Sequence, residues 1–189
     1  IGASTSAGKT IAAELLIDST LQKNKRVIYM SPLKTLTEEK FADWKTRYSN
    51  EELMIMTGDY ELSPAKQERL KASNIIVMTS EMMDSRTRKF EDERNEWMKE
   101  VGLVVVDEAH ILTTERGHAV ETGIMRFTSH NPDARILFLS ATMPNLRELG
   151  NWLTSLNGKK TDIVQSTWRP VDLELHYRAY PNATDNKGK

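Results

Sequence analysis

Short apolar runs alternate with helix-like segments along the chain, and this alternation is its most regular feature. The runs are almost continuously apolar and rich in β-branched residues, with no alternation of apolar and polar positions. Strands of this kind are covered on both faces, which is typical of a parallel sheet. The runs are Arg26–Ser31, Glu52–Thr57, Asn74–Ser80, Gly102–Glu108 and Arg135–Thr142, with a weaker sixth at Asp162–Ser166.

Apolar residues recur at helical spacing between these runs, as Ile11, Leu15 and Leu16 do after the first loop. Alternating strands and helices predict an α/β fold with a doubly wound parallel sheet flanked by helices. In such sheets, binding sites form at the carboxyl ends of the strands. The predicted helices are Lys9–Gln22, Thr35–Tyr48, Ser63–Ala72, Glu81–Thr87, Glu91–Glu100, Ala119–Ser129 and Leu146–Ser155.

Composition excludes several classes of protein. The 189 residues suit one domain with a full hydrophobic core. The formal net charge is −1, so any anion must be bound by a local site and not by a global basic field. The absence of cysteine excludes disulfides and thiolate chemistry. The sequence contains no apolar run of membrane-spanning length and no visible signal peptide, so we expect an intracellular protein without a membrane partner.

The segment "ASTSAGKT", Ala3 to Thr10, has the residues of a phosphate-binding loop. Small residues let backbone N–H groups surround phosphate oxygens, Lys9 can reach the outer phosphates, and the Thr10 hydroxyl can bind Mg²⁺. Ala3 stands where the pattern G-x-x-x-x-G-K-[ST] has its first glycine. The alternative is a chance Gly-Lys-Thr at a helix start. The residues predicted to bind the nucleotide are Thr5, Ser6, Ala7, Gly8, Lys9 and Thr10.

Two carboxylates, Asp107 and Glu108, follow the apolar run "LVVV" directly. Carboxylates at the end of a buried strand are costly unless something stabilises their charge, and Mg²⁺ would do so. Asp107 can hold the metal through its water shell, while Glu108 can orient and deprotonate an attacking water. The alternative is a pair of ordinary loop acids. Together with Lys9, the two acids predict an NTPase catalytic site, and His110 is placed to sense the γ-phosphate.

These motifs resemble those of the superfamily 2 DExH helicases, and within them the Ski-like group. The segment "ASTSAGKT" resembles motif I of that group, in which alanine at the first position is normal. The other matching segments, in chain order, are "SPLKTLTEEK" (Ser31–Lys40), "TGD" (Thr57–Asp59), "TSE" (Thr79–Glu81), "DEAH" (Asp107–His110), "ERG" (Glu115–Gly117), "SATMPN" (Ser140–Asn145) and "WRP" (Trp168–Pro170).

The resemblance implies a RecA-like first motor domain over residues 1–168, without the strand before its phosphate loop. Residues 169–189 would lead out toward a missing second motor domain, so the chain alone should bind nucleotide weakly and hydrolyse little. ATP and Mg²⁺ would be the cofactors. Ser140 and Thr142 could hydrogen-bond the acidic motif and, with His110, couple nucleotide state to the grip on a single strand.

Small polar residues at the strand ends could hold the backbone of a single-stranded nucleic acid. Each of them could equally serve as an ordinary turn or helix-cap residue. The predicted strand-binding residues are Ser31, Pro32, Lys34, Thr57, Gly58, Thr79, Ser80 and Arg116.

The motifs do not distinguish DNA from RNA, because they would contact phosphate and sugar. "VVVDEAHIL" and "STWRP" resemble the archaeal fork-repair DNA helicase, which favours DNA and a role in DNA repair. An RNA helicase of the same group, a translocase that does not unwind, and a scaffold that has lost hydrolysis remain alternatives.

Overall fold

A computed structural model describes residues 1–4, 7–58, 63–141, 143, 145–169, 174 and 176–178. Its centre is a sheet of five strands in the order β3-β4-β2-β5-β6, and every neighbouring pair is parallel. The predicted α/β fold with a parallel sheet is therefore confirmed. The strands are β2 (Arg26–Ser31), β3 (Leu53–Met56), β4 (Ile75–Thr79), β5 (Val101–Val106) and β6 (Arg135–Phe138).

Two further short strands join the two ends of the described chain. Strand β1 (Gly2–Ala3) pairs in parallel with β7 (Gln165–Ser166), and Gly2 also forms a bridge with Ser140, just after β6. The amide of Ala3 donates to the carbonyl of Ser140 at 3.1 Å. Strand β1 therefore continues the sheet beyond β6, so that β6 lies between β1 and β5. The expectation that the strand before the phosphate loop is missing was therefore wrong, because a two-residue strand carries no periodicity from which it could be predicted.

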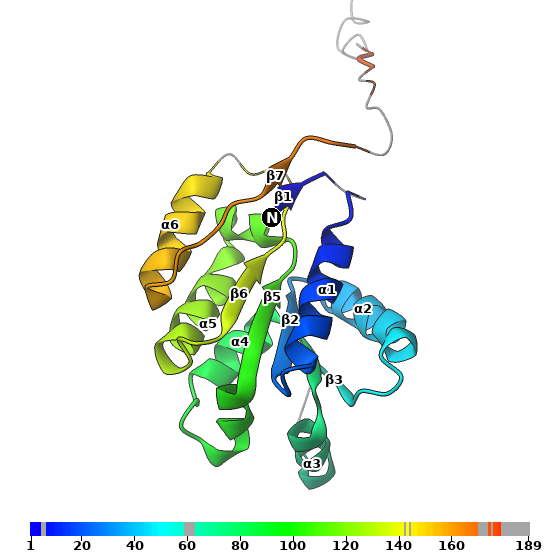
Figure 1. Ribbon diagram of the computed structural model, residues 1–189, viewed down its shortest axis with the longest axis vertical. Helices are drawn as coiled ribbons and strands as arrows, with labels where there is room; N and C mark the ends of the chain where they lie inside the picture. The colour runs from blue at the N-terminus through cyan, green and yellow to red at the C-terminus, as the bar shows by residue number, and fades with distance from the viewer. Residues whose placement is uncertain are drawn as a thin grey trace, which may run out of the picture.

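Helices cover both faces of the sheet (Figure 1). One face carries α1 and α2, and the other carries α4, α5 and α6. The predicted helix over Glu91–Glu100 is instead a 3-10 helix over Glu93–Glu100, which buries the adjacent residues Trp97 and Met98 and has no apolar stripe. The helices are α1 (Lys9–Leu21), α2 (Lys34–Arg47), α3 (Pro64–Ala72), α4 (Ser80–Thr87), α5 (Gly117–His130) and α6 (Leu146–Asn157), with 3-10 helices η1 (Glu93–Glu100) and η2 (Ala109–Thr113).

Two apolar clusters, one on each face of the sheet, form the core. Alternate residues of one strand belong to different clusters: Tyr29 packs with α1 and α2, whereas Met30 packs with α4 and α5. Both faces of β2 are buried, which explains why its sequence is continuously apolar. This packing, together with the pairing register, sets the position at which each strand ends relative to its neighbours.

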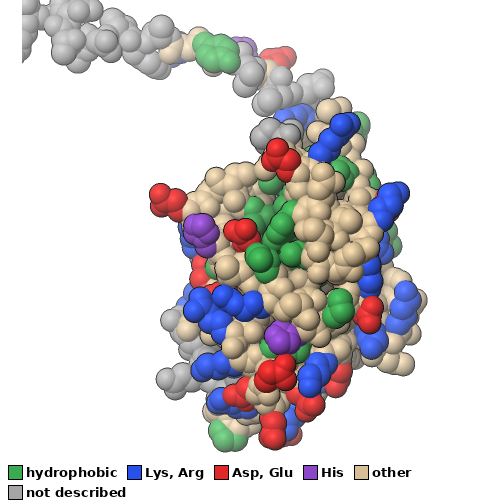
Figure 2. Space-filling view, turned by 90° about the vertical axis from the view of Figure 1, so that its left-hand side faces the viewer, with side chains coloured by type: hydrophobic (Ala, Val, Ile, Leu, Met, Phe, Trp, Pro, Cys, Tyr) green, Lys and Arg blue, Asp and Glu red, His purple; other side chains and the backbone are tan. Residues whose placement is uncertain are grey.

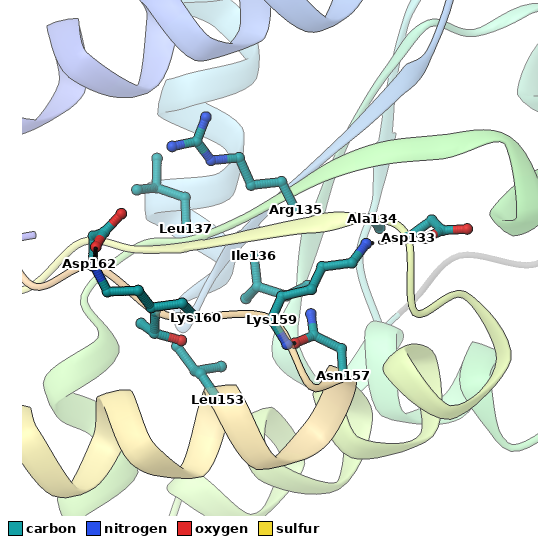
Figure 3. Close-up of a pocket in the computed structure, with 11 residues that line it drawn as sticks. Asp133, Ala134, Arg135, Ile136, Leu137, Leu153, Asn157, Lys159, Lys160 and Asp162 are labelled. Atoms are coloured by element: carbon teal, nitrogen blue, oxygen red, sulfur yellow. Dashed lines mark hydrogen bonds and ion pairs between the residues drawn. The ribbon is translucent and has the colours of Figure 1, made fainter.

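Away from the strand ends, the described surface includes a charged face and a cavity. The face with α5 and α6 mixes charged side chains of both signs (Figure 2). A cavity of about 340 Å³ lies between the start of β6 and the segment 159–162 (Figure 3). Lys159 pairs with Asp133 at its rim, at 3.0 Å. Since β6 begins there, this cavity lies away from the carboxyl ends. None of the described helices is both long and apolar enough to cross a membrane.

Candidate active site at the strand ends

The carboxyl ends of the parallel strands meet at one edge of the sheet, and the loops that follow them carry the predicted site. The phosphate loop leaves β1, and the acidic pair leaves β5. Strand β6, which ends in the segment with Ser140, lies between these two strands. The topology therefore brings together motifs that are about a hundred residues apart in the sequence.

The phosphate loop turns into helix α1 at Gly8. This glycine has φ of +84°, a left-handed conformation that other residues adopt only at a cost. A Cβ at this position would meet no atom within 4 Å, so the backbone conformation and not a close contact requires glycine. The first N–H groups of α1 lie at this turn and have no acceptor within the helix, as anion binding needs. Thr5 and Ser6 lie outside the described residues.

Lys9 is folded back over its own loop. Its Nζ donates to the carbonyl oxygens of Ala3 at 2.8 Å and Ser4 at 3.0 Å. The Ala7 amide donates to the same Ser4 carbonyl at 3.2 Å, which closes the loop on itself. Both of these partners of Lys9 are neutral carbonyls, so a phosphate could replace them as the stronger, charged acceptor.

The Asp107 carboxylate is held at the end of β5 by two donors. The Tyr29 hydroxyl donates to Oδ2, and the Glu108 amide donates to Oδ1 at 2.9 Å. The backbone is fixed as well, since the Asp107 amide donates to the Met30 carbonyl at 2.8 Å. Burial, together with the nearby Asp107 charge, raises the pKa of Tyr29 far above its usual range. Tyr29 therefore remains a protonated donor.

Glu108 has a different environment from its neighbour. Its φ is +50° and its ψ is 44°, a left-handed conformation that is uncommon for a residue other than glycine. This turn exposes about two fifths of the Glu108 side chain, and the carboxylate lies 3.0 Å from His110 Nδ1. The two adjacent carboxylates thus differ: Asp107 is held by two donors, whereas Glu108 is more exposed and lies beside His110.

The expected side-chain link between Ser140 and the acidic motif is not formed among the described residues. The Ser140 hydroxyl is buried and has no hydrogen-bond partner there. The link is made by the backbone, because the Ala109 amide donates to the Leu139 carbonyl at 2.8 Å. Thr142, the other predicted coupling residue, lies outside the described residues. The coupling roles of Ser140, Thr142 and His110 stay predictions.

The predicted strand-binding residues divide into buried and exposed groups. Ser31, Thr79 and Ser80 are at most 5% exposed. The Thr79 hydroxyl accepts from the Met82 amide at 3.4 Å, so it caps α4, as the alternative interpretation expected. Pro32 and Thr57 are also buried. The exposed members are Lys34, Gly58 and Arg116.

A hollow of about 490 Å³ joins several of these residues at the same edge. Pro32 and Leu33 line one part of it, and His110 and Arg116 line another. Arg116 lies 3.7 Å from Glu81 and is more than half exposed. The structure therefore brings the predicted strand contacts near the end of the acidic motif.

Comparison with known proteins agrees with this geometry. The model of the DEAD/DEAH box helicase family matches residues 1–149. The chain belongs to the DEAD/DEAH box helicase family. It is 35% identical over 178 residues to the DExH-box ATP-dependent RNA helicase DExH9 of Arabidopsis thaliana, which covers 94% of this chain and 16% of the relative. It is 34% identical over 192 residues to human activating signal cointegrator 1 complex subunit 3, covering 96% of this chain and 8% of the relative.

A third relative of the helicase chain, "mRNA transport homolog 4" of Caenorhabditis elegans, is 35% identical over 175 residues. That match covers 92% of the chain and 16% of the relative. The chain thus spans less than a fifth of the length of each of these relatives. The expected similarity to the archaeal fork-repair DNA helicase does not appear among these relatives.

Three contacts at the site of this helicase domain were missed by sequence reasoning. These are the Tyr29 hydrogen bond to Asp107, the packing of Trp44 on Tyr29 with ring centroids 4.6 Å apart, and the hydrogen bond from the Ser4 hydroxyl to the Trp168 carbonyl at 2.7 Å. Only Tyr29 gave a signal, because a polar-tipped residue within a buried strand needs a partner. The other two depend on packing between distant segments.

Proposed function

We propose that this chain is the ATP-binding motor domain of an ATP-dependent nucleic-acid helicase. The observation that carries the proposal is the arrangement of the phosphate loop and the acidic pair at one sheet edge, on strands that flank β6. A chance Gly-Lys-Thr or a pair of loop acids would not require this juxtaposition. Membership in the helicase family supports the same proposal.

The residues present fit ATP and Mg²⁺. The left-handed Gly8 opens the start of α1 toward an anion, and the carbonyls of Ala3 and Ser4 that now accept from Lys9 could be replaced by phosphate. The described residues hold no group of three or more His, Cys, Asp or Glu that could hold a metal ion. Mg²⁺ is commonly held by one or two protein oxygens together with substrate phosphates, and Thr10 and Asp107 would supply those oxygens.

The bound Mg²⁺ would neutralise charge on the phosphates. Lys9 and the loop amides would bind and orient the β- and γ-phosphates. Glu108 would align the attacking water and accept its proton, and its exposure leaves room for that water. His110 contacts Glu108 and also lines the hollow beside Arg116, so a change at this carboxylate during hydrolysis would alter contacts in the hollow.

A single nucleic-acid strand would cross the same edge of the sheet, held mainly through its phosphates. Lys34 and Arg116 would supply charge, and the exposed Gly58 would let the backbone approach closely. We propose RNA as the strand, because the Arabidopsis relative is by name an RNA helicase. DNA, which the sequence favoured through "VVVDEAHIL" and "STWRP", is the second candidate.

A complete helicase would also contain a second motor domain, and residues 169–189 would connect the two domains. The length of the relatives supports this proposal, since the chain matches only part of each. Most of the exit segment lies outside the described residues, so the proposed boundary at residue 168 stays a prediction.

The test is ATP hydrolysis by the full-length protein without nucleic acid, with single-stranded RNA and with single-stranded DNA. Lys9→Ala serves as the blank, and Glu108→Gln should bind nucleotide but fail to turn it over. Stimulation by RNA alone supports the proposed strand, and stimulation by DNA alone supports the second candidate. A Glu108→Gln protein with unchanged turnover would refute the catalytic assignment. A strand-displacement assay separates unwinding from translocation.

A further inference from the structure

Tyr29 lies outside every motif discussed above, yet it contacts the acidic motif directly. Its side chain is 0% exposed, and its hydroxyl donates to Asp107 Oδ2. The second donor to this carboxylate is the amide of the next residue, Glu108, which binds Oδ1. Each oxygen thus receives one donor from a different direction, and the two together fix the rotation of the carboxylate. Each oxygen keeps a lone pair for a further contact.

The register of the sheet explains this contact. Tyr29 in β2 pairs with Val105 in β5, and Asp107 lies two residues beyond Val105. Residues two apart in a strand point to the same face. A tyrosine at position 29 therefore reaches diagonally across to the residue that ends β5. A shift of β2 by one residue would turn its side chain to the opposite face.

A second set of contacts holds the Tyr29 ring in place. Trp44 of α2 packs against it edge-on, with centroids 4.6 Å apart and an interplanar angle of 74°. The Trp44 indole N–H donates to Glu14 of α1 at 2.9 Å, and Glu14 is itself 8% exposed. Arg47 lies 3.3 Å from the other carboxylate oxygen of Glu14. Glu14 of α1 thus contacts two residues of α2, on the face of the sheet that carries Tyr29.

We propose that Tyr29 is a positioning residue for the metal-binding carboxylate Asp107, and that Trp44 and Glu14 hold Tyr29 in place. This inference rests on the proposed function. Tyr29 does not touch the nucleotide in this proposal; it acts through Asp107. A buried network that joins Asp107 to both helices has a use beyond stability, because the carboxylate must keep one orientation when the metal arrives.

The experiment compares Tyr29→Phe with Tyr48→Phe in the full-length protein. Both changes remove one hydroxyl from a buried ring that packs on Trp44, but Tyr48 is not a donor to Asp107 among the described residues. Binding of a fluorescent ADP is measured in EDTA and then across a Mg²⁺ titration. Loss of an outer partner of a metal ligand commonly weakens metal affinity about tenfold or more. We expect Tyr29→Phe to raise the Mg²⁺ midpoint by about that factor and to leave metal-free binding unchanged.

The outcomes separate the inference from the proposed function. A Tyr29→Phe protein with the Mg²⁺ midpoint of Tyr48→Phe would overturn the inference alone. Equal loss of binding with and without Mg²⁺ would also overturn it, since that result shows a structural role only. If the wild-type protein binds no nucleotide at any Mg²⁺ concentration and Lys9→Ala changes nothing, the proposed function fails first. Thermal unfolding of both variants shows whether the fold is intact.

Discussion

Two buried tryptophans differ in the hydrogen bonding of the indole N–H, and this difference can be measured. Trp44 is 1% exposed and donates its indole N–H to Glu14 at 2.9 Å. Trp97 is 4% exposed, and its indole N–H has no hydrogen-bond partner among the described residues. Replacing each by phenylalanine removes the same atoms from a similarly buried site. Phenylalanine keeps an aromatic ring against Tyr29 and Tyr48, so the comparison reports mainly on the hydrogen bond to the carboxylate.

The expected magnitude follows from that bond. A hydrogen bond to a charged group contributes about 1.5–3 kcal/mol, and Trp44→Phe loses it, whereas Trp97→Phe loses none. Both variants also lose contacts and leave some cavity, which largely cancels in the difference. We expect Trp44→Phe to lower the free energy of unfolding by about 2 kcal/mol more than Trp97→Phe does.

The assay is urea unfolding followed by far-ultraviolet circular dichroism, because tryptophan fluorescence changes with both substitutions. The slopes of the unfolding curves should be equal, so that the midpoints report stability. Equal losses in the two variants would refute the reasoning, since the hydrogen bond to Glu14 would then contribute nothing. A larger loss of unfolding free energy in Trp97→Phe would show that differences in packing outweigh the hydrogen bond.

Three further changes test other parts of the molecule. Gly8→Ala should cost about 1 kcal/mol in thermal unfolding, because φ is +84°, and should weaken nucleotide binding measured by fluorescence. Gly117→Ala should cost about 1–3 kcal/mol more than Gly58→Ala, because its Cβ would lie 2.7 Å from backbone Cα of Leu112, whereas Gly58 has open space; equal melting temperatures would contradict this. Asp84→Asn should lower stability at pH 7 and flatten its decline in acid, as measured by urea unfolding between pH 2 and 7.

The sign of the Asp84 effect follows from its contacts. Burial raises the pKa of this carboxyl, but hydrogen bonds from Arg88, Thr122 and Arg126 outweigh it and hold the pKa below the usual value. A lowered pKa stabilises the fold above about pH 4, the unfolded value. That contribution is lost as the pH falls through the folded pKa. An unchanged acid profile in Asp84→Asn would contradict the assignment.

The sequence predicted the features that depend on local pattern. Continuously apolar strands such as β2 follow from burial on both faces. The segment Gly8 to Thr10 was predicted to start a helix, and α1 begins at Lys9. The parallel order of the strands then brought the phosphate loop and the acidic pair to one edge, as expected.

The missed features depend on register and on contacts between distant segments. The Tyr29 contact with Asp107 requires the pairing of Tyr29 with Val105, which no local pattern encodes. The left-handed turn at Glu108 could not be predicted, because glutamate rarely adopts it. Residue type alone left Thr79 with two possible roles, a nucleic-acid contact or a helix cap, and the structure shows the helix cap.

The pairing of β1 with β7 has a consequence for how the domain forms during synthesis. Gly2 pairs with Gln165, and it also bridges Ser140. Contacts between residues so far apart in sequence form slowly, since a long loop must close first. A ribosome delivers the phosphate loop before it delivers Ser140 and the β7 residues that pair with β1. The central strands of the nascent domain can therefore pair before β1, which leads into the phosphate loop, pairs with β7.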